Sequence, residues 1–235
     1  MAIGNITPDS FYASSRLQTE ADIRRWAQES LDSGASILDI GGCSTRPGSE
    51  AVSESEEWSR VQRALTVLKT FFPDACLSLD TFRAEIARRA LEEFGMMTIN
   101  DISGGNEAMY GVVRAYHAPY IWTLRGDLEL PSKQPEMLEM DVILDPGFGF
   151  IGSTEGDYAC MRRMDVLRAY GRPILIGVSR KSMVYRPLGL SPESCLSATQ
   201  ALQLYALEHG ATILRTHDVK ETQQILVLHE WLNRN

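Results

Sequence analysis

The feature that most constrains the fold is a unit that recurs along the chain. In each copy a stretch with helical periodicity ends at a glycine, a short apolar run follows, and a polar cluster closes the unit. Clear copies of the last two parts occupy residues 34–40, 95–101 and 210–215. Glycine suits the left-handed conformation just past a helix, and short apolar runs suit strands buried on both faces of a parallel sheet. The sequence therefore predicts alternating helices and parallel strands.

Apolar runs of strand length occur eight times. They lie near residues 2–6, 36–40, 75–80, 97–101, 119–124, 141–145, 173–178 and 212–216. Most connections between them carry an amphipathic helix, as where Ile86, Ala90 and Phe94 share one face. Eight alternations favour a closed (β/α)8 barrel, or TIM barrel, over an open doubly wound sheet. Because no linker or low-complexity segment interrupts the 235 residues, we predict one domain over residues 1–235.

Several helix boundaries are also marked in the sequence. Ser53 with Glu56 has the pattern of a capping box, and Ser191 followed by Pro192 marks the start of another helix. The connection between the fifth and sixth strands is the weakest, because only residues 126–140 are available and they contain prolines. We therefore expect this connection to be shortened to a couple of helical turns at most.

Charge and composition exclude some classes of protein. The chain carries 23 Lys and Arg against 31 Asp and Glu, and this net charge of −8 disfavours nucleic acid or an anionic membrane as the main partner. A small anionic substrate stays open, since a few nearby cations outweigh a global field at short range. No apolar run approaches the roughly 20 residues of a membrane helix, and residues 1–15 lack a signal-peptide pattern. We expect a cytoplasmic protein whose cysteines, without metal-ligand spacing, are reduced thiols.

Polar side chains gather at the predicted carboxyl ends of the strands, which face one mouth in a closed parallel barrel. The main ones are Asn5, Asp80, Asn100, Asp145, Lys181, Arg215 and His217. A single strand-end residue is often only a helix cap, and we expect that role for Thr81, Asp101 and Asp218. Seven ends converging on one mouth instead favour a single catalytic site, because buried carboxylates and amides are costly without a ligand.

These residue types suit two kinds of ligand. Buried Asp, Asn and Lys suit an aminated heterocycle, since a carboxylate accepts two N–H bonds from an amidine-like ring edge. Arg215 and His217, two residues apart on one strand, share a face. With Asn5, Ser44 and Thr45 they suit phosphate oxygens and a hard cation. Arginine binds phosphate in a bidentate manner, and Mg²⁺ favours oxygen ligands and waters shared with phosphates.

Seven motifs stand in order along almost the whole chain. They are NITPDSF at 5–11, GGCSTRPG at 41–48, SLDT at 78–81, INDI at 99–102, LDPGFGF at 144–150, GVSRKS at 177–182 and RTHDV at 215–219. Together they resemble the motifs of dihydropteroate synthases. One such motif would be weak, but seven in register are specific. The resemblance implies a transferase of folate biosynthesis that condenses 6-hydroxymethyl-7,8-dihydropterin pyrophosphate with para-aminobenzoate. It also implies a homodimer and a sulfonamide target.

The resemblance assigns roles to individual residues. It implies a pterin pocket of Asp80, Asn100, Ile102, Trp122, Asp145, Phe150, Gly177 and Lys181. It implies pyrophosphate contacts from Asn5, Ser44, Thr45, Arg215 and His217, with Asn5 also binding the Mg²⁺ cofactor. It implies a para-aminobenzoate site of Thr45, Arg46, Pro47, Phe150, Lys181 and Ser182. Catalysis would rest on Asp80, Asp145, Lys181, Arg215 and His217.

The chain departs from the family pattern in several places. Trp122 and Thr123 stand where Met-His is usual, and Ile151 and Gly152 stand where Gly-Lys is usual. The first strand starts at Met1, so we expect the N-terminal hairpin of the family to be absent. A tryptophan can still stack on a pterin, which makes Trp122 a candidate wall of the pocket.

Two alternatives stay open beside an active synthase. The departures fit a pterin-binding paralogue with weakened or lost catalysis. A related pterin-binding methyltransferase domain is the third possibility. The motifs at 44–48 and 179–182 favour the synthase, since they serve pyrophosphate and para-aminobenzoate and not a methyl donor.

Overall fold

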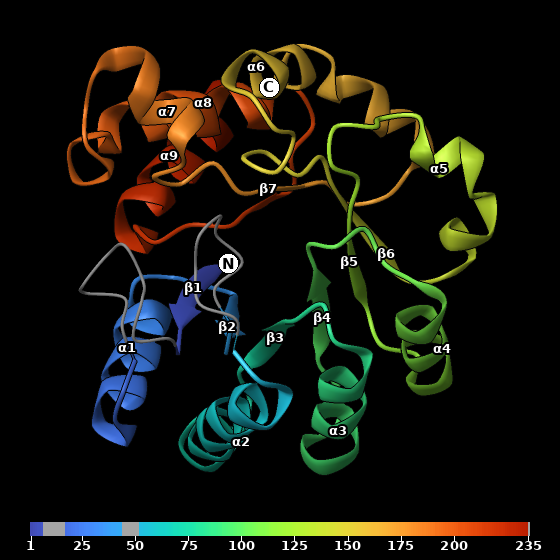
Figure 1. The fold of residues 1–235 in the computed structure, drawn as a ribbon. Coiled ribbons are helices and arrows are strands. Elements are labelled where there is room, and N and C mark those ends of the chain that lie inside the picture. The colour runs from blue at the N-terminus through green and yellow to red at the C-terminus, as the bar shows by residue number, and fades with distance from the viewer. Residues whose placement is uncertain (7–16, 44–51, 235) are drawn as a thin grey trace. The chain divides into compact units, whose positions relative to one another are not determined.

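The computed structural model of the chain describes residues 1–6, 17–43 and 52–234. The chain divides into two compact units, Met1–Tyr120 and Ile121–Asn235. Both units alternate strands with helices (Figure 1). All eight predicted strands are present. No helix in the described ranges is long and apolar enough to cross a membrane. That residues 1–235 form one domain stays a prediction.

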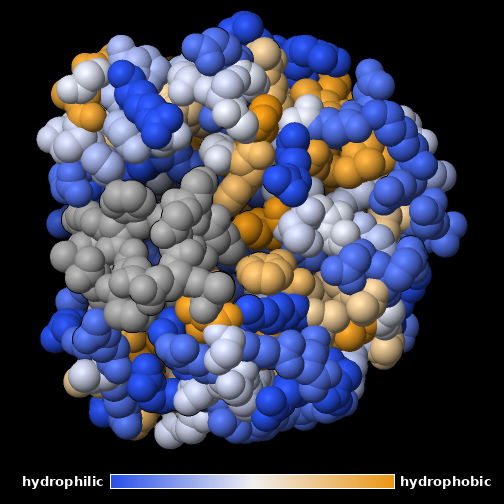
Figure 2. Space-filling model, in the orientation of Figure 1, coloured by the Kyte–Doolittle hydropathy of each residue, from blue (hydrophilic) through white to orange (hydrophobic). Residues whose placement is uncertain are grey.

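The first unit holds four regular strand–helix pairs. Its elements are β1 (Ala2–Asn5), α1 (Glu20–Asp32), β2 (Ile37–Gly41), α2 (Glu54–Phe71), β3 (Cys76–Asp80), α3 (Ala84–Phe94), β4 (Thr98–Asp101) and α4 (Glu107–Tyr116). The four strands are parallel and lie side by side in chain order. Figure 2 shows a mostly hydrophilic surface over the helices of this unit. This agrees with amphipathic helices whose apolar faces are buried against the sheet.

The strand register places the predicted residues of this unit in one row. Asn5 pairs with Gly41, Gly41 with Asp80, and Asp80 with Asn100. Two residues before Gly41 and Asp80 on the same strands, Asp39 pairs with Ser78. Residues two apart on a strand share a face, so both rows lie on the same side of the sheet. The other side is apolar and packed, with Leu38, Ile40, Leu77, Leu79 and Ile99 all buried.

Helix ends in the first unit follow the sequence with one difference. The Ser53 side chain accepts from the backbone N–H of Glu56, which is half of the predicted capping box. The complete reciprocal box occurs at the start of α1, between Thr19 and Asp22. Gly95 ends α3 as predicted, but its φ of 80° is combined with a ψ of −165°, so it lies outside the left-handed helical conformation that we expected while still using the positive φ that glycine favours.

The second unit is less regular. The boundary between the units falls within β5 (Tyr120–Thr123). The remaining elements are α5 (Leu130–Lys133), η2 (Pro135–Glu139), β6 (Val142–Asp145), α6 (Thr154–Met161), η3 (Met164–Tyr170), β7 (Leu175–Ile176), α7 (Ser182–Tyr185), η4 (Arg186–Leu188), η5 (Pro192–Ser194), α8 (Leu196–Glu208), β8 (Ile213–Leu214) and α9 (Val219–Leu232), where η denotes a 3-10 helix. β7 and β8 are parallel, with Leu175 beside Ile213 and Ile176 beside Leu214. The predicted shortening of the fifth connection is confirmed, because it holds only α5 and η2.

One predicted helix begins later than expected. Ser191 and Pro192 open a 3-10 turn, and α8 starts only at Leu196. The backbone carbonyls of Pro192 and Glu193 accept hydrogen bonds from Arg180 at 3.1 and 3.4 Å. In an α-helix these carbonyls would accept from the chain four residues on. The hydrogen bonds from Arg180 therefore occupy the carbonyl acceptors that the first turn of a longer helix would use.

Candidate active site

The first unit contributes an amide and a carboxylate from adjacent strands. Asp80 ends β3, and Asn100 stands beside it on β4 in register. Asn100 is buried and Asp80 is partly exposed. A Cβ at Gly41 would lie 3.4 Å from the Asp80 Cβ, so glycine on the neighbouring strand keeps the space beside Asp80 open. Asn5 occupies the same row at the end of β1 and is also partly exposed.

Asp39 is a site candidate that the sequence reasoning missed. It is fully buried in β2, one step back from the row of Asp80 and Asn100. The Asn100 Nδ2 lies 3.3 and 3.4 Å from the two Asp39 carboxylate oxygens. This contact turns the amide nitrogen of Asn100 toward Asp39, which leaves the amide oxygen as the group to meet a ligand N–H. The sequence contained a signal for Asp39, because a carboxylate within an apolar run that forms a buried strand is costly without a partner.

Ser78 lies beside Asp39 on the same face of the sheet. Its side chain is fully buried, and its Oγ has no hydrogen-bond partner among the described residues. A buried hydroxyl without a partner normally costs free energy. Ser78 therefore provides a probe of the same face, because the Asn100 amide nitrogen is directed to Asp39 and not to Ser78.

Asp145 is the buried carboxylate of the second unit. It ends β6, is 8% exposed, and accepts from the backbone N–H of Gly147 at 2.8 Å. The Thr123 hydroxyl lies 3.5 Å from its other oxygen. Burial raises the pKa of Asp145 above its ordinary value, while the positive charges of Lys181 and Arg215 act in the opposite direction. The raised pKa is the expected property of a carboxylate kept out of water for a ligand.

Lys181 reaches the loop that follows β6. Its Nζ donates to the backbone carbonyl of Phe148 and lies 4.7 Å from the centroid of the Phe150 ring. A Cβ at Gly149, which has a φ of 83°, would lie 2.9 Å from the Lys181 Cδ, so the lysine stem needs glycine there. A Cβ at Gly177 would lie 3.7 Å from the Lys181 Nζ and 3.8 Å from the Arg215 Cβ. The two cations therefore converge over Gly177.

Arg215 and His217 follow β8 and lie against the loop that follows β7. The Arg215 backbone N–H donates to the Ile176 carbonyl at 2.9 Å, which extends the parallel pairing beyond β8. The His217 backbone N–H donates to the Ser179 Oγ at 3.2 Å. These bonds bring together the motifs at 177–182 and 215–219. The second unit thus gathers a carboxylate and the predicted cations.

The predicted capping roles of three residues are wrong. The Asp218 side chain makes no cap bond to α9 and pairs with Arg180. Asp101 accepts from the Ser103 backbone and from the Tyr120 hydroxyl, whereas the α4 cap is made by Asn106. The Thr81 hydroxyl donates to Glu57, and α3 has no side-chain cap. Each side chain has a tertiary partner, and Thr81 and Asp101 accept in addition from a backbone N–H two residues on, ahead of the helix.

The remaining predicted residues fall in three groups. Ser44, Thr45, Arg46 and Pro47 lie outside the described residues. Ile102 follows β4, Phe150 and Gly177 lie beside Lys181, and Ser182 is the first residue of α7. Trp122 is fully buried next to Thr123 in β5. Neighbouring strand residues point to opposite faces, and Thr123 is the one that contacts Asp145, so Thr123 is better placed than Trp122 to line this pocket.

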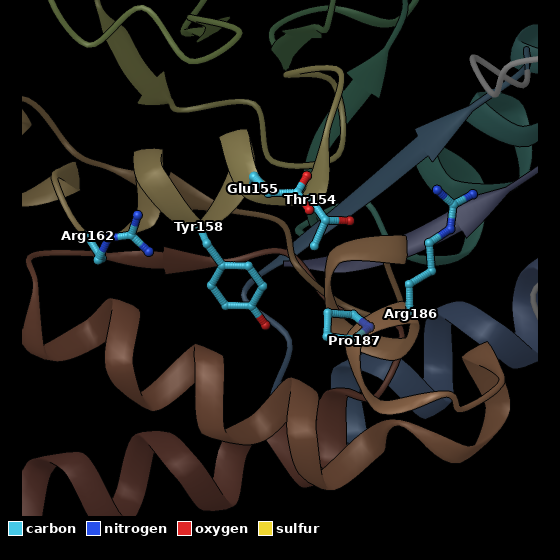
Figure 3. A pocket seen from close by; sticks show the side chains of 6 residues that line it. All are labelled: Thr154, Glu155, Tyr158, Arg162, Arg186 and Pro187. Atoms are coloured by element: carbon cyan, nitrogen blue, oxygen red, sulfur yellow. The ribbon is translucent and has the colours of Figure 1, made fainter.

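The second unit also carries a pocket of about 500 Å³ that was not predicted (Figure 3). Its lining residues come from α6 and the segment around η4, and they are Thr154, Glu155, Tyr158, Arg162, Arg186 and Pro187. The Tyr158 hydroxyl donates to the Met183 carbonyl at 3.2 Å, which ties α6 to α7. None of the predicted site residues lines it.

The chain offers few side-chain ligands for a metal ion in the part that the structure describes. The described ranges contain no group of three or more His, Cys, Asp or Glu side chains placed to hold a metal ion. Asn5 offers an amide oxygen at the end of β1. Mg²⁺ keeps several waters and is often bound by few protein oxygens together with substrate phosphates, so Asn5 fits such an ion.

Comparison with known proteins gives consistent matches. A family model described as pterin binding enzyme matches residues 1–135 and 131–217. The dihydropteroate synthase of Bacillus subtilis is 34% identical over 242 residues, which cover 94% of this chain and 84% of that protein. The structure of the Clostridium difficile dihydropteroate synthase in the presence of pteroic acid aligns with a TM-score of 0.87 and 32% identity, over 100% of this chain and 96% of that chain. The Yersinia pestis dihydropteroate synthase with a sulfonamide drug complex aligns with a TM-score of 0.88 and 31% identity, over 98% of this chain and 92% of that chain.

Proposed function

The chain belongs to the pterin-binding enzymes and, within them, to the dihydropteroate synthases, and we propose that its strand-end residues carry out the reaction of that family. Its fold is the (β/α)8 barrel of these enzymes. It is a transferase of folate biosynthesis that joins 6-hydroxymethyl-7,8-dihydropterin pyrophosphate to para-aminobenzoate, with release of pyrophosphate. The observation that carries this conclusion is the match in sequence and fold over nearly the whole chain.

The pterin is assigned to Asp80, Asn100, Asp145 and Lys181, with Ile102, Phe150 and Gly177 beside them. The two carboxylates accept N–H bonds from the aminated ring, and the buried state of Asp145 strengthens such bonds because water does not compete. The Asp39 contact turns the Asn100 amide so that its oxygen also accepts. This set of acceptors matches a heterocycle that is rich in N–H donors.

The pyrophosphate is assigned to Asn5, Arg215 and His217, together with Ser44 and Thr45 from the part outside the described residues. Arg215 and His217 are held beside the loop after β7 by backbone bonds. Mg²⁺, bound through Asn5 and the pyrophosphate oxygens, would neutralise part of the charge of the leaving group. Arg215 and His217 stabilise the same departing anion by charge and hydrogen bonds.

The incoming amine is assigned to Thr45, Arg46, Pro47, Phe150, Lys181 and Ser182. Lys181 is assigned to both the pterin site and the para-aminobenzoate site. Its Nζ lies 4.7 Å from the Phe150 ring centroid and close to Gly177. One related structure was determined with a sulfonamide drug complex. Sulfonamides resemble para-aminobenzoate in shape and charge, and we expect them to compete for this site.

The chemistry proceeds by departure of pyrophosphate before attack by the amine. The bond from the pterin methylene carbon to the pyrophosphate oxygen breaks, and the electron pair leaves with pyrophosphate. Asp80 and Asp145 stabilise the positive charge that develops on the pterin. The aniline nitrogen then bonds to the methylene carbon and loses one proton. Because the carbon is strongly electrophilic, the amine needs no strong base.

A homodimer in the cytoplasm is part of the proposal. Four apolar residues on α9 are well exposed, with Trp231 at 63% and Leu232 at 71%. With Val227 and Leu228 they repeat every four residues and share one face of the helix. Exposed apolar faces of this kind commonly mark association surfaces. We expect Trp231→Glu to shift the protein from dimer to monomer in sedimentation equilibrium, whereas an unchanged mass would exclude this face as the interface.

The test of the function is a pyrophosphate-release assay. Release must require Mg²⁺, dihydropterin pyrophosphate and para-aminobenzoate together, and it must yield 7,8-dihydropteroate. Calorimetry with the pterin substrate alone separates the remaining alternative. Well-folded protein that binds the pterin but gives no product would establish a non-catalytic pterin-binding paralogue instead.

A further inference from the structure

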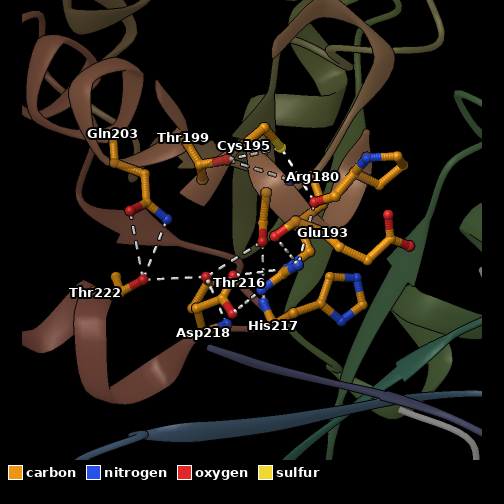
Figure 4. Close-up of polar contacts among 11 residues, drawn as sticks. Arg180, Glu193, Cys195, Thr199, Gln203, Thr216, His217, Asp218 and Thr222 are labelled. Atoms are coloured by element: carbon orange, nitrogen blue, oxygen red, sulfur yellow. Dashed lines mark hydrogen bonds and ion pairs between the residues drawn. The ribbon is translucent and has the colours of Figure 1, made fainter. Parts of the chain in front are cut away.

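Arg180 directly precedes Lys181, which is assigned to the reaction, while its own side chain bonds to other parts of the protein. It follows Ser179 and precedes Lys181 in the loop after β7. Its Nε and one terminal nitrogen donate to the two Asp218 oxygens at 3.0 and 2.6 Å (Figure 4). Its other terminal nitrogen donates to the carbonyls of Pro192 and Glu193. The side chains of the ion pair are only 9% and 11% exposed.

The backbone of Arg180 is in an unusual conformation. Its φ is 56°, in the left-handed region that side chains other than glycine seldom occupy. Such a conformation persists where surrounding contacts fix it. Here the bonds to Asp218, Pro192 and Glu193 supply those contacts. The shape of the loop that carries Lys181 is therefore tied to the Arg180 side chain.

Asp218 makes the same connection from the other motif. It directly follows His217, and its backbone N–H donates to the Thr216 hydroxyl at 3.1 Å. Thr216 in turn lies 3.5 Å from the Ser179 Oγ, which also accepts from the His217 backbone N–H. The network therefore closes on itself around His217, as the dashed lines in Figure 4 show.

We propose that the Arg180–Asp218 ion pair is a positioning device that holds Lys181 and His217 in register for pyrophosphate departure. This inference rests on the proposed function of those two residues. Arg180 acts through its neighbours, because all three guanidinium nitrogens donate to protein acceptors. Asp218 likewise accepts from Arg180 with both of its oxygens. Misplacing reacting groups by about 1 Å can cost on the order of 10²-fold in rate.

The test uses two conservative variants of the pair. Arg180→Lys keeps the charge but loses the bidentate contact, and Asp218→Asn keeps the shape but loses the charge. We expect the KM for dihydropterin pyrophosphate and the inhibition constant of inorganic pyrophosphate to rise together, each by about tenfold, with kcat reduced by about tenfold or more. Calorimetric titration with Mg²⁺-pyrophosphate should show the same loss of affinity.

Thr222→Val is the matched control. The Thr222 hydroxyl belongs to the far end of the same buried network, where it donates to Thr216 and accepts from Gln203. The Thr222 backbone N–H donates to the Asp218 carbonyl at 2.9 Å, and the substitution leaves this backbone bond and the Arg180–Asp218 side-chain pair in place. We expect this variant to lower the melting temperature by about as much as Arg180→Lys and Asp218→Asn do. Its affinity for pyrophosphate should stay within twofold of wild type. General loosening of the fold reduces the folded fraction but leaves the affinity of the folded molecules unchanged.

Two results would overturn the proposal. One is pyrophosphate affinity in Asp218→Asn and Arg180→Lys that stays within twofold of wild type. The other is an equal loss of affinity in Thr222→Val. If Asp218→Asn fails to fold, Arg180→Lys decides the question alone. Failure of the proposed function would appear differently, as absence of turnover in the wild-type protein, while pyrophosphate titration of the variants would still test the positioning role.

Discussion

The two units of the chain hold their functional groups in different ways. In the first unit, Asn5, Asp80 and Asn100 lie on strands of four or five residues and are placed by strand register. In the second unit, β7 and β8 have two residues each, and Lys181, Arg215 and His217 lie in the loops beyond them. The first unit presents carboxylates and amides, and the second presents the cations together with the Asp145 carboxylate.

The comparison shows that functional residues on strands and functional residues in loops need different numbers of contacts to be held in position. A residue on a regular strand needs one additional contact to orient its side chain, as Asp39 does for Asn100. A residue in a loop needs its backbone fixed as well, and the second unit does this with the bidentate Arg180–Asp218 pair and with Ser179. We therefore expect changes in the second unit to affect catalysis most strongly.

The largest effect is expected from Lys181→Ala. The variant removes the cation that lies beside Phe148, Phe150 and Gly177. Loss of one preorganised charge costs on the order of 10²-fold or more in rate, and we expect kcat/KM to fall by that amount. Lys133→Ala is the control, since Lys133 is an exposed lysine paired with Asp127. A near-normal rate for Lys181→Ala would contradict its placement in the site.

Asp145→Asn is expected to separate activity from stability. Because burial raises the pKa of Asp145 in the folded state, ionising this carboxyl costs the folded protein stability. The cost is absent below the ordinary pKa of the carboxyl, grows as pH rises, and is complete above the raised pKa. Asn carries no such cost, so the variant should be more stable than wild type at neutral pH while its rate falls on the order of 10²-fold.

The measurement for Asp145→Asn is urea unfolding over a series of pH values. The free energy of unfolding of wild type should fall relative to that of the variant as pH rises from the ordinary pKa of an aspartate. At acidic pH the two proteins should converge. Parallel curves, or a variant that is less stable at neutral pH, would show that Lys181 and Arg215 outweigh burial at this site.

The smallest effect is expected in the first unit, from Asp39→Asn. The variant replaces a carboxylate that only accepts with an amide that can also donate, so the Asn100 amide is no longer forced to turn its nitrogen toward position 39. We expect the KM for dihydropterin pyrophosphate to rise by about fivefold to tenfold, in line with about 1 kcal/mol for one oriented hydrogen bond, with no change in the KM for para-aminobenzoate.

Ser78→Ala is the matched control for Asp39→Asn. It removes a buried hydroxyl beside Asp39 that has no hydrogen-bond partner among the described residues. We expect normal kinetics and an unchanged or slightly raised melting temperature. Equal effects of the two variants on the KM for the pterin substrate would remove the special role of Asp39.

Local patterns were sufficient for most of the fold. All eight strands were found from apolar runs, and the shortened fifth connection followed from its prolines and its length. The errors share one cause. Asp218 was expected to cap α9, and Pro192 was expected to open α8, yet both residues interact with Arg180 from a distant part of the chain. Tertiary contacts compete with local ones for the same donors and acceptors.

The sequence by itself determined the alternation of elements, the family and the residue types at the strand ends, because these depend on short-range order along the chain. Only the tertiary structure decided which groups support them. Asn100 meets Asp39 across 61 positions, and Arg180 meets Asp218 across 38. In the sequence, any carboxylate could serve as the acceptor for Asn100 or Arg180. Strand register and packing decide which carboxylate lies within reach. The chemistry was therefore visible in the sequence, whereas its positioning was visible only in the fold.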